Sequence, residues 1–303
     1  MADHFISIAD YSREWIDEIF DMTEEIKTKL KNGETFHPLA GKTLAMVFQK
    51  PSARTRISFE TGMYQLGGHA LYLGPQDIGL GKREATKDLA QLFSRYNDIV
   101  MARLFGHSDM EELAKYSTVP VINGLTDYNH PCQIMTDMYT VKEHLGRITD
   151  LKLVYFGDGN NIVNSFLNFA AKVPFHFVVS CPEGYEPDKK TLEEAKNAGL
   201  SKIEVVSDPY TAIKDADVVY TDVWASMGQE AEMEERKKVF KTYQVNMELF
   251  SKAKPGCKFM HCLPAHRGDE VTDEVVDSPA SIVFDEAENR MHVQKAVMVK
   301  LMS

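Results

Sequence analysis

Reactive side chains gather in one short segment, residues 52–56 (SARTR), which follows the strand-like apolar run 44–48. Apolar residues then recur at helical spacing as far as Leu66, so Ser52 stands where the N-cap of a helix belongs. A helix N-terminus attracts anions, and arginine adds forked, charge-assisted hydrogen bonds. The segment therefore indicates a pocket for a small phosphorylated molecule. A capped helix with two solvated arginines is the alternative.

Other reactive side chains also follow strand-like runs: Arg103 comes after 99–102, Asp222 after 218–220 and Cys262 after 259–260. In open parallel sheets, ligands bind beyond the carboxyl ends of the strands. We therefore expect an enzyme whose site lies in the cleft between two such sheets.

Two of these positions suggest specific roles. His130 and Gln133 flank the start of a helix opened by Pro131, where an imidazole and an amide beside an arginine could polarise a carbonyl oxygen. Asp222 is a suitable partner for a substrate ammonium group. The alternatives are a histidine cap with a solvated glutamine, and a turn capped by Asp222.

The segment 157–161 (GDGNN) resembles a dinucleotide-binding turn but lacks the full glycine pattern. Its two asparagines at a helix N-terminus could instead hold a carboxylate or an amino group, and a plain Asx turn is an equal alternative. Near Cys262, the histidines 261 and 266 lack a fourth partner and the usual spacing of a zinc site, so no metal is expected. No base for a cysteine nucleophile is evident, and an inert buried thiol remains possible.

Composition limits the class of protein. The 303 residues suggest two domains, and a net charge of −11 argues against broad nucleic-acid or anionic-membrane binding. The four cysteines form no CxxC pair, no apolar run is as long as a membrane span, and no signal peptide is evident. These features favour a cytoplasmic protein with reduced thiols.

Strand-like and helix-like segments alternate along the chain after an amphipathic helix at 13–30, which predicts an α/β fold of two doubly wound parallel-sheet domains. A change of domain is expected near 146–150. The first domain would be residues 1–146 plus a C-terminal helix, 286–303, and the second residues 147–285. The expected strands are 43–48, 69–73, 98–102 and 119–122, then 152–156, 175–180, 203–206, 217–220, 258–260 and 281–284.

Together the motifs resemble the aspartate/ornithine carbamoyltransferase family. The resemblance rests on segments that follow the family's order through nearly the whole chain: 50–56, 102–103, 123–127, 130–133, 157–161, 222–228, 261–264 and 286–290. It implies a carbamoyl-phosphate-binding first domain and an ornithine-binding second domain, no cofactor, a homotrimer, and transfer of the carbamoyl group to the δ-amine of ornithine to give citrulline in arginine biosynthesis.

The resemblance also implies roles for individual residues. The carbamoyl-phosphate site would comprise Ser52, Ala53, Arg54, Thr55, Arg103, His130, Gln133, Cys262, Leu263 and Arg290. The ornithine site would comprise Asn161, Asp222, Ser226 and Met227. Arg103, His130 and Cys262 would be catalytic: the first two would polarise the carbonyl, and the thiol would lie beside the reacting amine.

Two positions depart from the family pattern. Ala53 replaces the usual threonine, which removes a hydroxyl but keeps the backbone N–H, and Gly79 stands where a glutamine or histidine commonly reaches the adjacent subunit's site. Three other functions remain open: a carbamoyltransferase with another amine acceptor such as putrescine, a non-catalytic anion-binding regulator on the same fold, and a nucleotide-dependent dehydrogenase.

Overall fold

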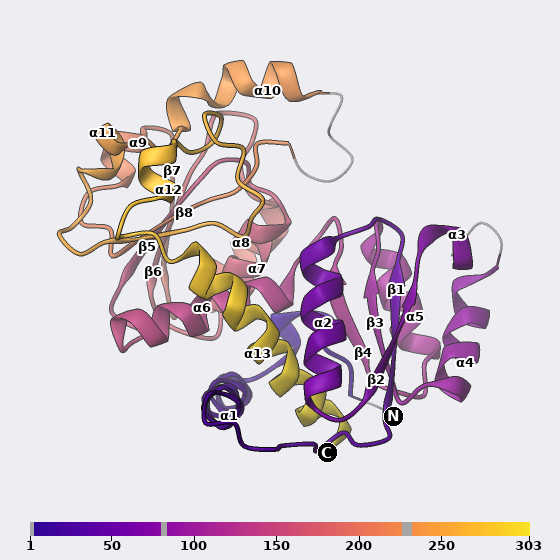
Figure 1. The fold of residues 1–303 in the computed structure, drawn as a ribbon. Helices are drawn as coiled ribbons and strands as arrows, with labels where there is room; N and C mark the ends of the chain where they lie inside the picture. The colour runs from indigo at the N-terminus through magenta and orange to yellow at the C-terminus, as the bar shows by residue number, and fades with distance from the viewer. Residues whose placement is uncertain (1–2, 80–83, 226–231) are drawn as a thin grey trace. The chain divides into compact units, whose positions relative to one another are not determined.

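The computed structural model describes residues 3–79, 84–225 and 232–303, which form two compact units. Unit 1 comprises residues 1–136 and 288–303, and unit 2 comprises residues 137–287, so the division falls within the helices α6 (Pro131–Leu145) and α13 (Val283–Met302). Each unit is built around its own parallel sheet (Figure 1). This confirms the predicted α/β fold with two parallel-sheet domains.

The sheet of unit 1 has the strand order β2-β1-β3-β4. Its strands are β1 (Thr43–Phe48), β2 (His69–Leu73), β3 (Ile99–Arg103) and β4 (Val121–Leu125). The helices of this part of the chain are α1 (Arg13–Lys31), α2 (Ala53–Gln65), α3 (Pro75–Ile78), α4 (Thr86–Tyr96) and α5 (His107–Tyr116), with a 3-10 turn at Ile8–Asp10. Figure 1 shows α2 on one side of this sheet and α4 and α5 on the other.

The sheet of unit 2 has the strand order β7-β6-β5-β8-β9. Its strands are β5 (Lys152–Phe156), β6 (His176–Ser180), β7 (Lys202–Val206), β8 (Val218–Thr221) and β9 (Lys258–Met260). The helices are α7 (Asn161–Ala170), α8 (Lys189–Asn197), α9 (Pro209–Ala212), α10 (Met233–Phe240), α11 (Met247–Phe250) and α12 (Asp273–Val276), with a 3-10 turn at Lys241–Tyr243.

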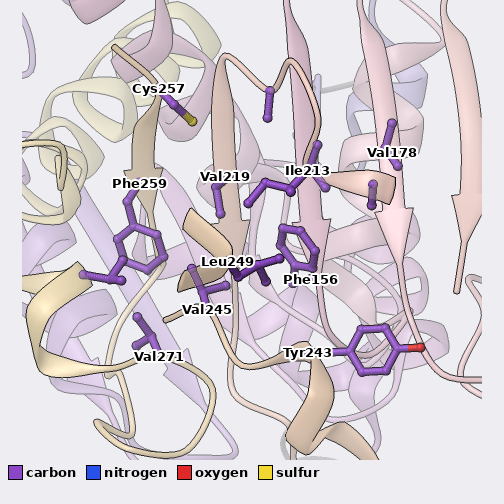
Figure 2. Close-up of a cluster of buried hydrophobic side chains, with 14 of the residues drawn as sticks. Phe156, Val178, Ile213, Val219, Tyr243, Val245, Leu249, Cys257, Phe259 and Val271 are labelled. Atoms are coloured by element: carbon purple, nitrogen blue, oxygen red, sulfur yellow. The ribbon is translucent and has the colours of Figure 1, made fainter. Parts of the chain in front are cut away.

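A buried apolar cluster covers one face of the second sheet (Figure 2). Phe156, Val219 and Phe259 project from β5, β8 and β9 into this cluster, where Leu249 of α11 meets them. Burying a side chain of this size stabilises the fold by about 1.5–3 kcal/mol. The cluster therefore fixes the strands whose carboxyl ends carry the reactive residues.

At the amino ends of their strands, both sheets contain the same kind of aspartate contact. Asp98 precedes β3 and accepts hydrogen bonds from the backbone N–H of Thr43 (2.8 Å) and from Lys42 Nζ (2.9 Å). Asp217 precedes β8 and accepts from the backbone N–H of Lys152 (2.9 Å) and from Lys254 Nζ (2.9 Å). In each unit an aspartate thus joins the two strands between which the sheet order reverses.

Two predicted strands need correction. Residues 281–284 are not a strand, because only Ser281 bridges to Phe259 and α13 already begins at Val283. A short apolar run cannot distinguish a strand from the buried face of a helix. The fourth strand lies at Val121–Leu125 rather than 119–122, and it includes Gly124, where a Cβ would come within 2.6 Å of Met101 Sδ.

No helix in the three described ranges is both long and apolar enough to cross a membrane.

Candidate active site

The first group of predicted residues lies at the N-terminus of α2. Ser52 is its N-cap: the Ser52 Oγ accepts from the backbone N–H of Thr55 at 3.4 Å and lies 3.1 Å from Thr55 Oγ1. Ala53 is the first residue of the helix and Arg54 the second. Because Ser52 lies shortly after the end of β1 and the neighbouring strand β3 ends in Arg103, this group occupies the point where the strand order reverses.

Two guanidinium groups converge on one hydroxyl in this group. Arg103 Nη1 donates to Thr55 Oγ1 at 3.3 Å, and Arg290 Nη2 donates to the same oxygen at 3.1 Å. Arg290 Nη1 also donates to Gln133 Oε1 at 2.6 Å. Thr55 and Gln133 are buried, as is Arg290. The structure therefore brings together residues from β3, α2, α6 and α13 that are far apart in the sequence.

The electrostatics of this group are strongly positive. The pKa of His130 lies well below its ordinary value, chiefly because the ring is buried and further because Arg290, Arg103 and Arg54 carry positive charge nearby. The imidazole is therefore neutral at physiological pH. A site that holds three guanidinium groups around a neutral imidazole is suited to an anion that also presents a carbonyl oxygen.

A hydrogen-bonded turn positions His130. The backbone N–H of Thr126 donates to the carbonyl of Asn129 at 3.0 Å, and the N–H of Asn129 donates back to Thr126 Oγ1 at 3.3 Å. Asn129 Nδ2 ties the turn to the carbonyl of Ile6 at 3.3 Å. Asn129 was not among the predicted residues, although a buried polar turn before a helix-opening proline is a readable signal.

The second group of predicted residues lies in unit 2, around the Asp222 carboxylate. Asp222 Oδ2 accepts from Asn160 Nδ2 at 3.2 Å, while Asp222 Oδ1 accepts from the backbone N–H of Val223 at 2.8 Å and from Cys262 Sγ at 3.1 Å. Asp222 is 7% exposed. These residues follow β5, β8 and β9, again where the strand order reverses.

Cys262 is a protonated thiol in this arrangement. Burial raises its pKa well above the ordinary value, and the charge of Asp222 and the hydrogen bond to it raise the pKa further. A thiol held in this form is a poor nucleophile, since the thiolate is the reactive species. The proton on Sγ is donated to Asp222, which leaves the sulfur lone pairs as acceptors.

Asn160, one of the two asparagines that the sequence indicated, makes a contact in this group that sequence reasoning missed. It is the N-cap of α7, and its Oδ1 accepts from the backbone N–H groups of Ile162 at 3.0 Å and Val163 at 3.4 Å. The predicted residue Asn161 is the next one along, at the first position of the helix. An asparagine before an apolar helical run is an N-cap signal, but its second contact, with Asp222, could not be read from spacing.

The glycines of 157–161 have a packing role. A Cβ on Gly159 would lie 2.4 Å from the backbone of both Glu186 and Pro187, so no larger residue fits there. Asp158 pairs with the buried Arg236 at 2.8 Å, and Arg236 also donates to the carbonyl of Trp224 at 2.9 Å. Close packing therefore explains Gly159, and an ion pair within unit 2 explains Asp158. These two requirements account for the resemblance of the turn to a dinucleotide-binding pattern.

One cluster has the composition of a metal site. The ligand atoms of Asp222, His261 and Cys262 lie within 4.8 Å of one another. Both ring nitrogens of His261 are engaged, however, because Nδ1 accepts from the backbone N–H of Leu263 at 2.8 Å and Nε2 lies 3.1 Å from Glu270 Oε1. A metal would have to displace one of these hydrogen bonds.

Other predicted residues fall elsewhere. Arg56, expected at the phosphate pocket, instead pairs with Glu60 at 3.0 Å and lies over the ring of Tyr72 on an exposed face. Leu263 lies in unit 2 beside Cys262. Ser226 and Met227 lie outside the described residues.

Both halves of the chain match models of one protein family. Residues 3–143 match the model of the aspartate/ornithine carbamoyltransferase carbamoyl-P binding domain, and residues 149–301 match that of the Asp/Orn binding domain. The chain belongs to the aspartate/ornithine carbamoyltransferase family. The two groups of residues described above fall one in each matched domain, apart from Arg290, which α13 contributes to unit 1.

Relatives within this family are similar along nearly the whole chain. A chloroplastic ornithine carbamoyltransferase of Pisum sativum is 60% identical over 98% of this chain and 80% of its own length. An ornithine carbamoyltransferase of Thermococcus kodakarensis is 56% identical over 98% of this chain and 95% of its own length. The solved ornithine carbamoyltransferase of Pyrococcus furiosus superposes with a TM-score of 0.94 at 52% identity, covering 98% of this chain and 96% of that chain.

Proposed function

We propose that the protein transfers the carbamoyl group of carbamoyl phosphate to the δ-amine of L-ornithine, giving L-citrulline and phosphate. The observation that carries this proposal is the convergence of Arg103 and Arg290 on Thr55 at the N-terminus of α2, beside the neutral His130. Relatives named ornithine carbamoyltransferase, one of them labelled anabolic, support ornithine as the acceptor and arginine biosynthesis as the pathway.

Unit 1 would bind carbamoyl phosphate. The phosphate dianion suits the first N–H groups of α2, the hydroxyls of Ser52 and Thr55, and the guanidinium of Arg54. When the anion arrives, the donors of Arg103 and Arg290 that now meet at Thr55 would turn to its oxygens. The family resemblance adds Gln133, Cys262 and Leu263 around the carbamoyl end.

Unit 2 would bind ornithine. The Asp222 carboxylate, held by Asn160 and by the backbone of Val223, is a fixed negative partner for an ammonium group. Asn161 lies next to it at the start of α7. The assignment of Ser226 and Met227 to the same substrate rests on the family resemblance.

The proposed reaction needs no covalent intermediate with the protein. The lone pair of the neutral δ-amine forms a bond to the carbonyl carbon, whose oxygen becomes an oxyanion stabilised by Arg103 and the His130 ring. The tetrahedral intermediate collapses as the bond between carbon and the phosphate oxygen breaks, and the surplus proton of the amine nitrogen passes to the departing phosphate. Holding both substrates in place contributes several kcal/mol, or about 7–11 kcal/mol in the most favourable alignments.

The thiol of Cys262 would act as a hydrogen-bond acceptor in this reaction. Its proton is directed to Asp222, so the sulfur can accept a hydrogen bond from the amine and align the nitrogen lone pair. Because its pKa is raised, the thiol does not add a second negative charge that would favour the unreactive ammonium form.

A trimer is the assembly we propose, by family resemblance. β2 is an edge strand of its sheet, and its Leu71 is 42% exposed. On α2, which contacts β2, Ile57 is 63% and Tyr64 is 77% exposed. Unpaired strand edges with apolar neighbours are suited to contact another chain. Gly79 ends α3 in the left-handed region at φ 54°, which explains a glycine there and removes side-chain help from that position. Sedimentation as a monomer at micromolar concentration would contradict this assembly.

The cytoplasm is the compartment we propose, because the four cysteines are unpaired thiols.

A comparison of acceptors tests the proposed function. Purified protein would be given carbamoyl phosphate with ornithine, putrescine, aspartate or lysine, and the carbamoylated product measured by a colorimetric ureido assay. We expect ornithine to exceed each other acceptor by at least about tenfold in kcat/KM. Putrescine lacks the α-amino group that Asp222 would bind, lysine carries its terminal amine one methylene farther out, and aspartate has no side-chain amine. Preference for putrescine would establish the alternative acceptor, and no product with any amine would favour an anion-binding regulator.

A further inference from the structure

The turn after β9 holds Leu263 in a conformation that leucine avoids. Its φ is 56°, and the two other non-glycine residues with positive φ in the described ranges are aspartates, which tolerate this region. A leucine is strained in the left-handed region and persists there only where its surroundings enforce it. Something next to Leu263 must therefore hold the turn.

The ring of His261 supplies that constraint. Its Nδ1 lies 2.8 Å from the backbone N of Leu263, and a backbone N–H can only donate, so Nδ1 carries no proton. In the neutral ring the proton is then on Nε2, which donates to Glu270 Oε1 at 3.1 Å. The two hydrogen bonds together fix both the tautomer and the orientation of the imidazole.

Glu270 is in turn fixed by its own surroundings. It is 0% exposed, its Oε1 also accepts from the backbone N–H of His266 at 2.6 Å, and its carbonyl accepts from the N–H of Val245 at 2.9 Å. The backbone N–H of His261 donates to Glu286 Oε2 at 3.1 Å. Glu270 Oε1 thus accepts two hydrogen bonds in a buried setting, which holds this side of the carboxylate in place.

Cys262 lies between the two residues that these bonds hold. With the backbone fixed at His261 and at Leu263, the direction of the Cys262 side chain is set, and its Sγ meets Asp222 Oδ1 at 3.1 Å. Freeing the backbone of Leu263 would let the turn relax and move the thiol away from the carboxylate.

We propose that His261 and Glu270 are positioning residues for the reaction: the carboxylate orients the imidazole, and the imidazole holds the Leu263 turn so that the Cys262 thiol faces Asp222. The effect on turnover rests on the proposed function, whereas the effect on the thiol does not. The role is analogous to that of carboxylates that orient metal-binding histidines, where the loss of the outer partner costs about 10–100-fold.

Two substitutions separate the hydrogen bonds of His261. The side-chain oxygen of His261→Asn reaches the position of Nδ1 and can accept from Leu263, but the contact with Glu270 is lost. The longer amide of His261→Gln reaches the position of Nε2 and can donate to Glu270, but the N–H of Leu263 loses its acceptor. We expect His261→Gln to lower kcat with ornithine about 10–100-fold and His261→Asn to be affected less.

The reaction of Cys262 with iodoacetamide gives a readout independent of turnover. Cys262 is half-buried and the other three cysteines are buried, so labelling located by peptide mass reports on this thiol. We expect the labelling rate to rise about tenfold in His261→Gln, because the Cys262 thiol loses its hydrogen bond to the Asp222 carboxylate. The rate should stay close to wild type in His261→Asn. His266→Gln, at a half-exposed ring 3.9 Å from the same carboxylate, is the matched control and should label like wild type.

The carboxylate can be tested in the same way. Glu270→Gln keeps an oxygen acceptor for His261 and His266 and should remain close to wild type. Glu270→Leu leaves the imidazole without the partner that orients it, so Nδ1 no longer stays on the N–H of Leu263 and the variant should behave like His261→Gln. Equal losses of turnover and equal falls in thermal midpoint for both His261 variants, or unchanged labelling in His261→Gln, would overturn the proposal. A labelling difference in a protein that makes no citrulline would instead reject the proposed function and leave the positioning role standing.

Discussion

The guanidinium of Arg54 distinguishes the phosphate assignment from a solvated helix cap. Arg54→Ala should raise the KM for carbamoyl phosphate at least about tenfold, because each charge-assisted hydrogen bond contributes about 1.5–3 kcal/mol. The KM for ornithine should change little.

Arg56→Ala provides a control on the same turn of α2, since Arg56 pairs with Glu60 on an exposed face. Its kinetics should stay close to wild type. Wild-type affinity for carbamoyl phosphate in Arg54→Ala, measured by steady-state kinetics, would refute the phosphate assignment.

Substitution of Cys262 tests how the amine is activated. Cys262→Ser should keep carbamoyl-phosphate binding but lower turnover and weaken ornithine binding, because the shorter hydroxyl cannot hold both Asp222 and the amine at the thiol's distances. The activity of the wild-type protein should rise with pH through the alkaline range. Burial and the charge of Asp222 raise the pKa of the Cys262 thiol well above its ordinary value, so we assign the rise to deprotonation of an amine whose reference pKa is about 10.4.

Cys257→Ser is the matched control, because Cys257 lies in the apolar cluster of the second sheet and should affect stability alone (Figure 2). Unchanged turnover in Cys262→Ser would mean that the thiol of Cys262 has only a structural role.

At the scale of elements, the N-cap of α7 joins folding to function. Asn160→Ala should destabilise the protein by about 0.5–2 kcal/mol through loss of the cap, and it should also raise the KM for ornithine because Asp222 loses a partner. Asp188→Ala removes the N-cap of α8 and should produce the first effect without the second. Thermal midpoints and ornithine kinetics of both variants would check this, and parallel kinetic losses would refute it.

The sequence predicted elements wherever local pattern decides the structure. The bounds of β1, β2, β5 and β9 agree with the prediction because apolar runs there are flanked by turns or helix caps. At 281–284 the same reasoning was wrong, since α13 begins at Val283 and the buried Ile282 and Val283 lie where the chain enters that helix.

Long-range contacts explain what spacing could not reveal in the candidate site. Arg290 reaches Thr55 and Gln133 across more than half of the chain, and only the family resemblance placed it there. Asn160 and Glu270 act through side chains that meet Asp222 and His261 after folding. Arg56 has the right residue type at the right spacing, yet the helix turns it away from Ser52 toward Glu60.

At the scale of the whole molecule, buried titratable groups predict a window of maximal stability. Burial raises the pKa of Cys132, Cys181 and Cys257 to about 12, whereas unfolded thiols titrate near 9.0. Above about pH 9 the unfolded chain therefore releases protons that the folded chain keeps, and stability falls by up to about 1.4 kcal/mol per pH unit for each thiol.

The acid limit of this window comes from a pKa that folding lowers instead of raising. The pKa of His130 is depressed in the folded chain, so below about pH 6.5 the unfolded chain takes up a proton that the folded chain does not, and stability falls again. The thermal midpoint should thus be highest between about pH 6.5 and 9. A midpoint that stays constant up to pH values well above 9 would contradict the burial of the thiols.

The two units are proposed to serve one transfer reaction, and its stoichiometry is the most direct test. Citrulline and phosphate would be measured in the same reaction of purified protein with carbamoyl phosphate and ornithine. The account predicts equal amounts of both products, formation that requires both substrates, and loss of both products together in Arg54→Ala. Release of phosphate without citrulline, or without dependence on ornithine, would contradict it.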